Sequence, residues 1–327
     1  MLLASGQLII GLFLLFGGGH YLVQGATRTA LLARVSTAVV GLTVVAMGTS
    51  LPELAVSMGA AARVSPDLAY ANIVGSTIFN IGMILGVSAV IAPMIVKHQT
   101  LRLEYPFMFL GACIVLLLCR SDDQIDRLEG AFLVVALMLF TAYVVYLAQR
   151  QVDDDEAAAL EREVQRTANV KGSLRRAWGI NGLLIVLGIT ALVAGADHLV
   201  RGAVKIAVIW DVPERMIGLT VVAMGTSLPE LATSAVAARE GEHEIALANV
   251  IGSNLFNLLG VLGATAVLFP VPINSAARDI DNWVMLGFCA AMFPLMWFGR
   301  KVGRWDGVVL LTGFAVYMGF IVLVRGT

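Results

Sequence analysis

Two glutamates stand immediately after prolines inside apolar stretches of the chain. Glu53 follows Pro52, and Glu230 follows Pro229. A proline inside a helix removes one backbone hydrogen bond and crowds the carbonyl four residues earlier, so we expect each helix to break here. A carboxylate at the centre of a membrane costs roughly 3 kcal/mol unless it is neutralised. Because neither stretch contains Lys or Arg, the two glutamates predict a site for a cation supplied from outside the chain.

Other oxygen-bearing groups accompany both glutamates. A helix break would release carbonyls near residues 46–48 and 223–225, and these cannot stay unpaired in hydrocarbon. Hydroxyl side chains lie next to the same breaks, at Thr49, Ser50, Thr226 and Ser227. Carbonyl, hydroxyl and carboxylate oxygens are hard ligands that suit Na⁺ or Ca²⁺. The pattern therefore indicates an alkali or alkaline-earth cation as the ligand.

Two further stretches carry polar side chains at intervals of four residues. That spacing places each set on one face of a helix. The midpoints of these stretches fall near Asn80 and Asn257, so both asparagines are expected at the depth of the glutamates. The two sets are Asn72, Ser76 and Asn80, and Asn249, Ser253 and Asn257.

The chain contains an internal repeat. Residues 41–55 and 218–232 both read GLTVVAMGTSLPELA, an offset of 177 residues, and the same offset relates Asn80 to Asn257. Residues 1–150 and 179–327 are therefore interpreted as two copies of one unit, with cores near 41–91 and 218–268, joined by a linker at 151–178. An odd number of spans per unit would invert the second copy, which is the architecture of secondary carriers.

The composition identifies the solvent around this fold. Hydrophobic residues make up 58% of the 327 and charged residues only 14%, so lipid must cover most of the surface. We expect an all-α integral membrane protein with ten transmembrane helices in two inverted five-helix repeats, in which broken helices 2, 3, 7 and 8 form the midplane site. The expected spans are 6–26, 36–62, 68–91, 103–119, 130–148, 179–203, 212–238, 244–269, 282–298 and 306–324.

Several function classes are disfavoured. A net charge of −1 argues against a nucleic-acid-binding face. The spans contain no nucleophile–base pair and no metal-binding His cluster, so neither an enzyme nor a resident cofactor is expected. Loops on the side of 149–178 carry most of the 22 Lys and Arg residues, which places this loop in the cytoplasm and both termini outside an inner (plasma) membrane.

These motifs resemble a known family. The paired Gly-Thr-Ser-Leu-Pro-Glu segments (48–53 and 225–230) and Gly-Ser-x-x-Phe-Asn segments (75–80 and 252–257) are similar to the α-repeats of sodium/calcium exchangers, a branch of the cation/Ca²⁺ antiporter superfamily. The resemblance implies electrogenic exchange of Na⁺ for Ca²⁺ by alternating access, with the first and sixth spans sliding across the others. It implies ion ligands at Glu53, Glu230, Thr49, Thr226, Ser50, Ser227, Ser76, Ser253, Asn80, Asn257, Ala46 and Ala223.

One position departs from part of this family. Some members, including potassium-dependent ones, have Asp where this chain has Asn257, so we expect no K⁺ requirement. The expected partners are Ca²⁺, Na⁺ and the bilayer, and one protomer should suffice for transport. A proton-coupled exchanger of Ca²⁺ or another divalent cation remains open because glutamates can bind H⁺ instead. A cation channel is a further alternative, and the sequence leaves the oligomeric state undetermined.

Overall fold

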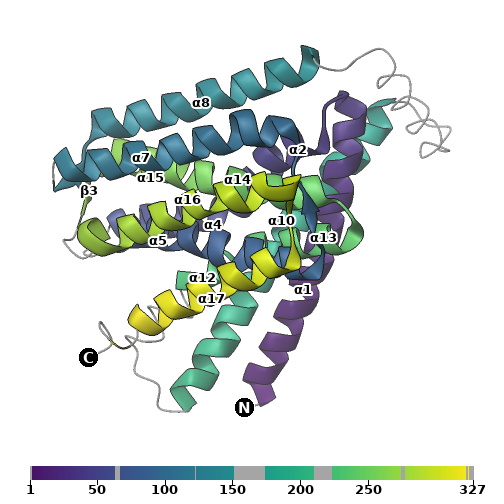
Figure 1. The fold of residues 1–327 in the computed structure, drawn as a ribbon. Helices are drawn as coiled ribbons and strands as arrows, with labels where there is room; N and C mark the ends of the chain where they lie inside the picture. The colour runs from purple at the N-terminus through teal and green to yellow at the C-terminus, as the bar shows by residue number, and fades with distance from the viewer. Residues whose placement is uncertain are drawn as a thin grey trace.

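The computed structural model describes residues 2–62, 67–121, 123–150, 174–209, 223–273, 277–321 and 323. These residues are almost entirely helical (Figure 1). Among the described residues, seven helices are long and apolar enough to cross a membrane, and a bent pair brings the number to eight if it forms one span. The prediction of a multi-pass all-α membrane protein is confirmed. Most of the predicted linker lies outside the described residues.

The first half of the chain begins with one long helix and continues through a bent one. Between the later helices lie two very short strands. The elements are α1 (Leu2–Ala33), α2 (Thr37–Val40), η1 (Gly41–Val45), α3 (Ala46–Thr49), α4 (Leu51–Ala61), α5 (Asp67–Phe79), η2 (Asn80–Leu85), α6 (Gly86–Ile91), β1 (Met94–Ile95), η3 (Thr100–Glu104), α7 (Tyr105–Ser121), β2 (Gln124–Ile125) and α8 (Arg127–Arg150).

The second half follows the same order. Two of the ten predicted spans are not among the helices that are long and apolar enough to cross: residues 212–222 of the span 212–238 lie outside the described residues, and α17, which covers most of the span 306–324, has 17 residues. The elements are α10 (Leu174–Ile209), α12 (Ala223–Gly225), α13 (Leu228–Glu240), α14 (His243–Leu255), η5 (Phe256–Val261), α15 (Leu262–Leu268), β3 (Val271–Pro272), η6 (Ala277–Asp281), α16 (Asn282–Trp297), η7 (Phe298–Arg300), β4 (Lys301–Val302) and α17 (Arg304–Phe320).

Two short antiparallel ribbons tie the halves together. β1 pairs with β4, where Met94 lies opposite Val302, and β2 pairs with β3, where Ile125 lies opposite Val271. Met94 and Val271 are 177 residues apart, as are Ile125 and Val302. β1 and β3 are therefore equivalent strands of the two repeats, as are β2 and β4, and the two ribbons are counterparts of each other.

The helix interruptions differ between spans. The second span bends by 42° between α3 and α4, with Pro52 in the first turn of α4. In the seventh, a turn at Thr226–Ser227 separates α12 from α13. The prediction that the third and eighth spans are also broken was wrong, because 68–91 and 243–268 each run as one continuous helix. These spans contain no proline, and their π-helical stretches η2 and η5 keep the backbone groups hydrogen-bonded.

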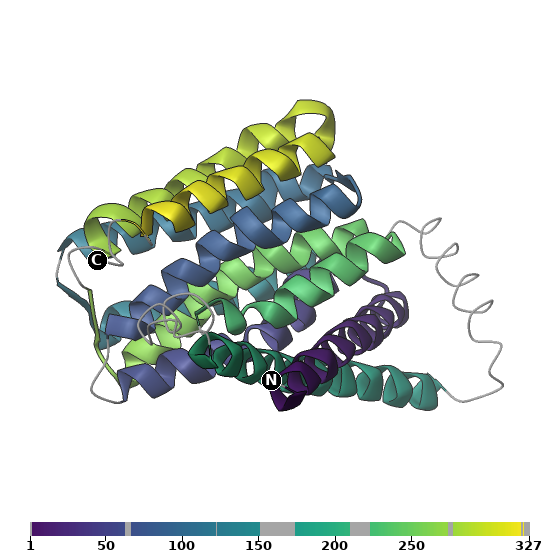
Figure 2. The same ribbon diagram turned by 90° about the horizontal axis from the view of Figure 1, so that it is seen from below.

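The two longest helices, α1 and α10, cross closely at one side of the bundle (Figure 2). A Cβ added at Gly11 would lie 2.8 Å from the carbonyl oxygen of Gly195, and one at Gly18 would lie 2.8 Å from that of Gly188. The order of these contacts makes the two helices antiparallel. Glycines thus bring the two backbones into direct contact, as small residues do between membrane helices.

Candidate ion-binding site

Glu53 and Glu230 lie opposite each other in the first turns of α4 and α13. Both are fully buried, with 0% and 1% of their surface exposed. The hydroxyl of Ser50 donates to Glu230 Oε1 at 2.8 Å, and that of Ser227 donates to Glu53 Oε1 at 2.8 Å. These reciprocal hydrogen bonds join the two bends. They also place each carboxylate at the positive end of a helix, which favours negative charge.

The remaining oxygens of this cluster are the informative ones. Buried polar atoms in native proteins nearly always have a hydrogen-bond partner. Six buried oxygens on predicted ligand residues have no such partner among the described residues, and all are of the type that Na⁺ and Ca²⁺ bind. They are Glu53 Oε2, Glu230 Oε2, Ser76 Oγ, Ser253 Oγ, Asn80 Oδ1 and Asn257 Oδ1.

Positive groups are not seen near either glutamate in the part of the chain that the structure describes. The ion pairs there join other carboxylates to side chains at the edge of the bundle. They are His20 with Glu240, Lys97 with Glu244, and Arg201 with Asp197. The donor set therefore fits a cation that arrives as cargo.

Two more asparagines brace the glutamate-bearing helices. Asn72 Nδ2 donates to Ser57 Oγ at 3.0 Å and to the carbonyl of Glu53 at 3.5 Å. Asn249 repeats this geometry in the second half, with Ser234 Oγ at 2.9 Å and the Glu230 carbonyl at 3.5 Å. These side chains fix the helix that carries each glutamate against its neighbour.

The predicted carbonyl ligands fare differently from the side chains. The Ala46 carbonyl accepts the backbone N–H of Ser50 at 3.0 Å and the hydroxyl of Thr49 at 3.3 Å, so it is not released by the bend as expected. The last turn of α3 still closes, and the chain departs from helical geometry only at Ser50. At the second bend, Ser227 N–H bonds instead to Met224, one residue beyond Ala223.

Comparisons with known proteins identify the family of the chain. A family model described as sodium/calcium exchanger protein matches residues 3–148 and 180–323. The chain belongs to the sodium/calcium exchanger family. As a member, it is a membrane transporter and not an enzyme.

Individual relatives cover nearly the full length of this exchanger. The putative antiporter CaxA of Alkalimonas amylolytica is 35% identical over 97% of this chain and 98% of its own. The sodium/calcium exchanger MaX1 of Methanosarcina acetivorans is 30% identical over 95% and 96%. A solved structure of the sodium-calcium exchanger NCX_Mj, soaked with 10 mM Na⁺ and zero Ca²⁺, superposes with a TM-score of 0.83 at 29% identity, covering 97% and 98%.

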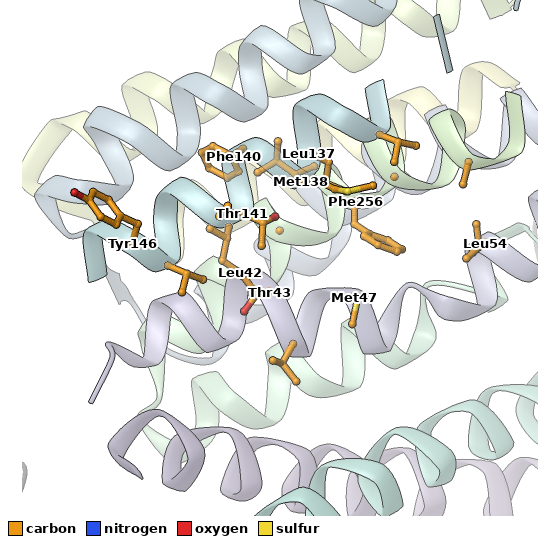
Figure 3. A pocket seen from close by; sticks show the side chains of 18 residues that line it. Leu42, Thr43, Met47, Leu54, Leu137, Met138, Phe140, Thr141, Tyr146 and Phe256 are labelled. Carbon is orange, nitrogen blue, oxygen red and sulfur yellow. The ribbon is translucent and has the colours of Figure 1, made fainter. Parts of the chain in front are cut away.

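A large pocket of this exchanger lies away from the carboxylates. Its volume is about 810 Å³, and it opens between α8, η5 and the bent second span (Figure 3). Leu42 and Met47 form one wall, and Leu137, Met138 and Phe256 form the opposite one. Neither glutamate lines it, so this apolar pocket is separate from the polar cluster.

Sequence reasoning missed one buried polar residue beside the site. Asn254 is fully buried, and its Oδ1 accepts a hydrogen bond from Asn80 Nδ2 at 3.1 Å. The repeat did not point to it, because the residue 177 positions earlier is Thr77. The signal available in the sequence was this substitution within two otherwise matching motifs.

Proposed function

We propose that this exchanger moves Na⁺ and Ca²⁺ in opposite directions across the plasma membrane by alternating access. The observation that carries the proposal is the pair of buried glutamates, each with one carboxylate oxygen held by a serine and the other without a partner among the described residues. A buried charge in that condition is costly, so a bound cation is needed to compensate it. Ca²⁺ or several Na⁺ ions would compete for the same oxygens.

The number of carboxylates supports a particular ion balance. Two glutamates neutralise one Ca²⁺, and Asn257 adds no third charge. Transport is thus proposed to be independent of K⁺. Electrogenic exchange is proposed on the resemblance of the motifs to those of sodium/calcium exchangers. Glu53 and Glu230 are the shared ligands. The other proposed ligands are Thr49, Thr226, Ser50, Ser227, Ser76, Ser253, Asn80 and Asn257, with the carbonyl of Ala223.

A two-fold architecture goes with this function. The proposed organisation is ten spans in two inverted repeats, 1–150 and 179–327, with both termini extracytoplasmic and the loop 149–178 cytoplasmic. The two strand pairs support it, because the 177-residue offset relates β1 to β3 and β2 to β4. The reciprocal serine–glutamate hydrogen bonds support it as well. A single protomer contains every proposed ligand.

The decisive test removes one charge at a time. Glu53→Gln and Glu230→Gln keep the shape of the side chain and abolish its charge. Both are expected to reduce Na⁺-gradient-driven ⁴⁵Ca²⁺ uptake into inverted vesicles to background. Asp197→Asn removes the charge of an exposed carboxylate that pairs with Arg201 within α10, and should leave uptake intact. Transport retained in both site variants would refute the proposal.

The coupling ion is tested in the same assay. Buried carboxylates can bind H⁺ in place of Na⁺, and this observation keeps proton coupling as the second candidate. Purified protein in liposomes would be given Na⁺, K⁺ and pH gradients separately. Uptake of ⁴⁵Ca²⁺ should follow the Na⁺ gradient alone. Uptake driven by a pH gradient without Na⁺ would replace sodium coupling with proton coupling, and single-channel currents would instead indicate a channel.

A further inference from the structure

The amide of Asn80 is held in one orientation by a neighbour from the other half of the chain. Asn80 Nδ2 donates to Asn254 Oδ1 at 3.1 Å, which leaves Asn80 Oδ1 without a partner among the described residues. Asn254 is in turn oriented from its other end, because its Nδ2 contacts the sulfur of Met108 on α7 at 3.7 Å. Both asparagines are at most 1% exposed. The chain of contacts therefore runs from α7 through α14 to the start of η2.

The equivalent position in the first half lacks this arrangement. Thr77 stands 177 residues before Asn254, and its hydroxyl donates to the Ile73 carbonyl of its own helix at 2.9 Å. It makes no hydrogen bond to Asn257 that the structure records. Both amide atoms of Asn257 lack a partner among the described residues. The two central asparagines thus occupy matching positions but only one of them is oriented.

We propose that Asn254 is a positioning residue that turns the carbonyl oxygen of Asn80, and not its NH₂ group, toward the transported cation. The inference rests on the proposed function, because it takes the cation as the ligand of Asn80. The two ends of an amide are nearly equal in size but opposite in hydrogen-bonding character. An NH₂ group aimed at a cation repels it, so the orientation of the amide decides whether Asn80 is a ligand. Asn257 is left able to turn either end toward the site.

The expected effect follows from the fraction of competent molecules. Without an acceptor at 254, Asn80 can present either end, and the apparent dissociation constant rises by the inverse of the competent fraction. One net hydrogen bond favours the competent orientation by about fivefold in the wild type, so its loss lowers the competent fraction from about five sixths to about one half. Apparent Ca²⁺ affinity should therefore fall by about twofold while the maximal transport rate is largely kept.

The test compares two variants of nearly equal shape. Asn254→Leu removes the acceptor, whereas Asn254→Asp keeps an oxygen for Asn80 Nδ2. Equilibrium ⁴⁵Ca²⁺ binding to purified protein is measured together with the KM and maximal rate of Ca²⁺ uptake. The Leu variant should bind about twofold more weakly with a raised KM, and the Asp variant should restore binding close to wild type. Thr77→Val is the matched control from the first half and should change neither quantity.

A second background separates positioning from packing. In Asn80→Asp both ends of the side chain are oxygens, so no orientation remains to be selected. Asn254→Leu should then leave binding unchanged relative to that background, whereas a packing defect would keep its full effect. An Asn254→Leu protein with wild-type affinity, or an Asp variant as weak as the Leu variant, would overturn the inference. Wild-type protein that binds Ca²⁺ but ignores a Na⁺ gradient would refute sodium coupling and leave this test intact, whereas absence of Ca²⁺ binding would refute both.

Discussion

The helices α13 and α4 carry the two glutamates at equivalent positions, but their outer faces have different surroundings. On α13, which packs against α1, Thr233 is 0% exposed, whereas its counterpart on α4, Val56, is 41% exposed. A Cβ at Gly19 of α1 would lie 3.2 Å from Val236 of α13. The counterpart of Val236 is Gly59 of α4, where an added Cβ would meet no described atom within 4 Å.

This difference separates a fixed part of the molecule from one that can shift. Around the glutamates, the hydrogen bonds of the two halves match in partner and length, at 2.8 Å in each case. The α1–α10 pair breaks that symmetry by packing on α13. Within the pair, Gly11 and Gly18 of α1 approach the backbone of α10 closely, so the two helices can move as one unit. We therefore expect a second arrangement in which the pair covers α4, as alternating access requires.

The largest effect should come from locking that second arrangement. Ala196 of α10 is the counterpart of Gly19, so Gly59→Cys with Ala196→Cys should form a disulfide only when α10 covers α4. Oxidation is expected to stop exchange almost completely and a reductant to restore it, in a protein whose Cys113, Cys119 and Cys289 have been replaced. Activity before and after oxidation, with cross-linking followed on gels, measures this.

A matched pair of cysteines serves as the control. Gly19→Cys with Val236→Cys joins residues that already touch, and should cross-link readily in the arrangement described here. Because it locks the opposite state, it should also stop exchange. If Gly59 and Ala196 fail to cross-link under every ion condition, the second arrangement does not exist in this form.

An intermediate effect is expected at the glycine contact of α1 with α10. A Cβ at Gly18 would lie 2.8 Å from backbone atoms of α10, whereas one at Gly17 would meet no described atom within 4 Å. Gly18→Leu should therefore lower stability by about 1–3 kcal/mol through overpacking. Gly17→Leu makes the same change on the neighbouring residue and should stay within about 0.5 kcal/mol of wild type. Thermal unfolding in detergent compares them, and equal losses would contradict a tight α1–α10 contact.

The smallest effect concerns the ion pair that joins α1 to α13. His20 Nδ1 lies 2.5 Å from Glu240 Oε1, with the two side chains 50% and 32% exposed. Exposed pairs contribute at most about 1 kcal/mol. His20→Asn should thus raise Gly59–Ala196 cross-linking by no more than about fivefold. Arg201→Gln removes a pair within α10 and should leave cross-linking unchanged. If Arg201→Gln changed cross-linking more than His20→Asn does, the His20–Glu240 pair would have no specific role between the helices.

Much of the site could be predicted because, within each copy of the repeat, the polar residues lie only a few positions apart in the chain. The midplane carboxylates, their serine and asparagine neighbours and the membrane class all follow from residue type, spacing and apolar length, and the membrane class is confirmed. The breaks expected in the third and eighth spans were wrong, because polar and glycine residues there are accommodated by π-helical turns without a proline. The prediction that the bend releases the Ala46 carbonyl was also wrong, because this carbonyl still accepts the backbone N–H of Ser50.

The sequence by itself determined that two copies of one apolar unit each carry a proline, a glutamate and a fixed set of oxygen donors, because these depend only on residues close together in the chain. Only the tertiary structure decided that Ser50 donates to Glu230 and Ser227 to Glu53, and that Asn254 accepts a hydrogen bond from Asn80. It also decided that α1 covers α13 and leaves the outer face of α4 exposed. The hydrogen bonds among these relations join residues 174 to 180 positions apart. Side-chain spacing cannot reveal them, because helix packing alone sets which of two equivalent faces is covered.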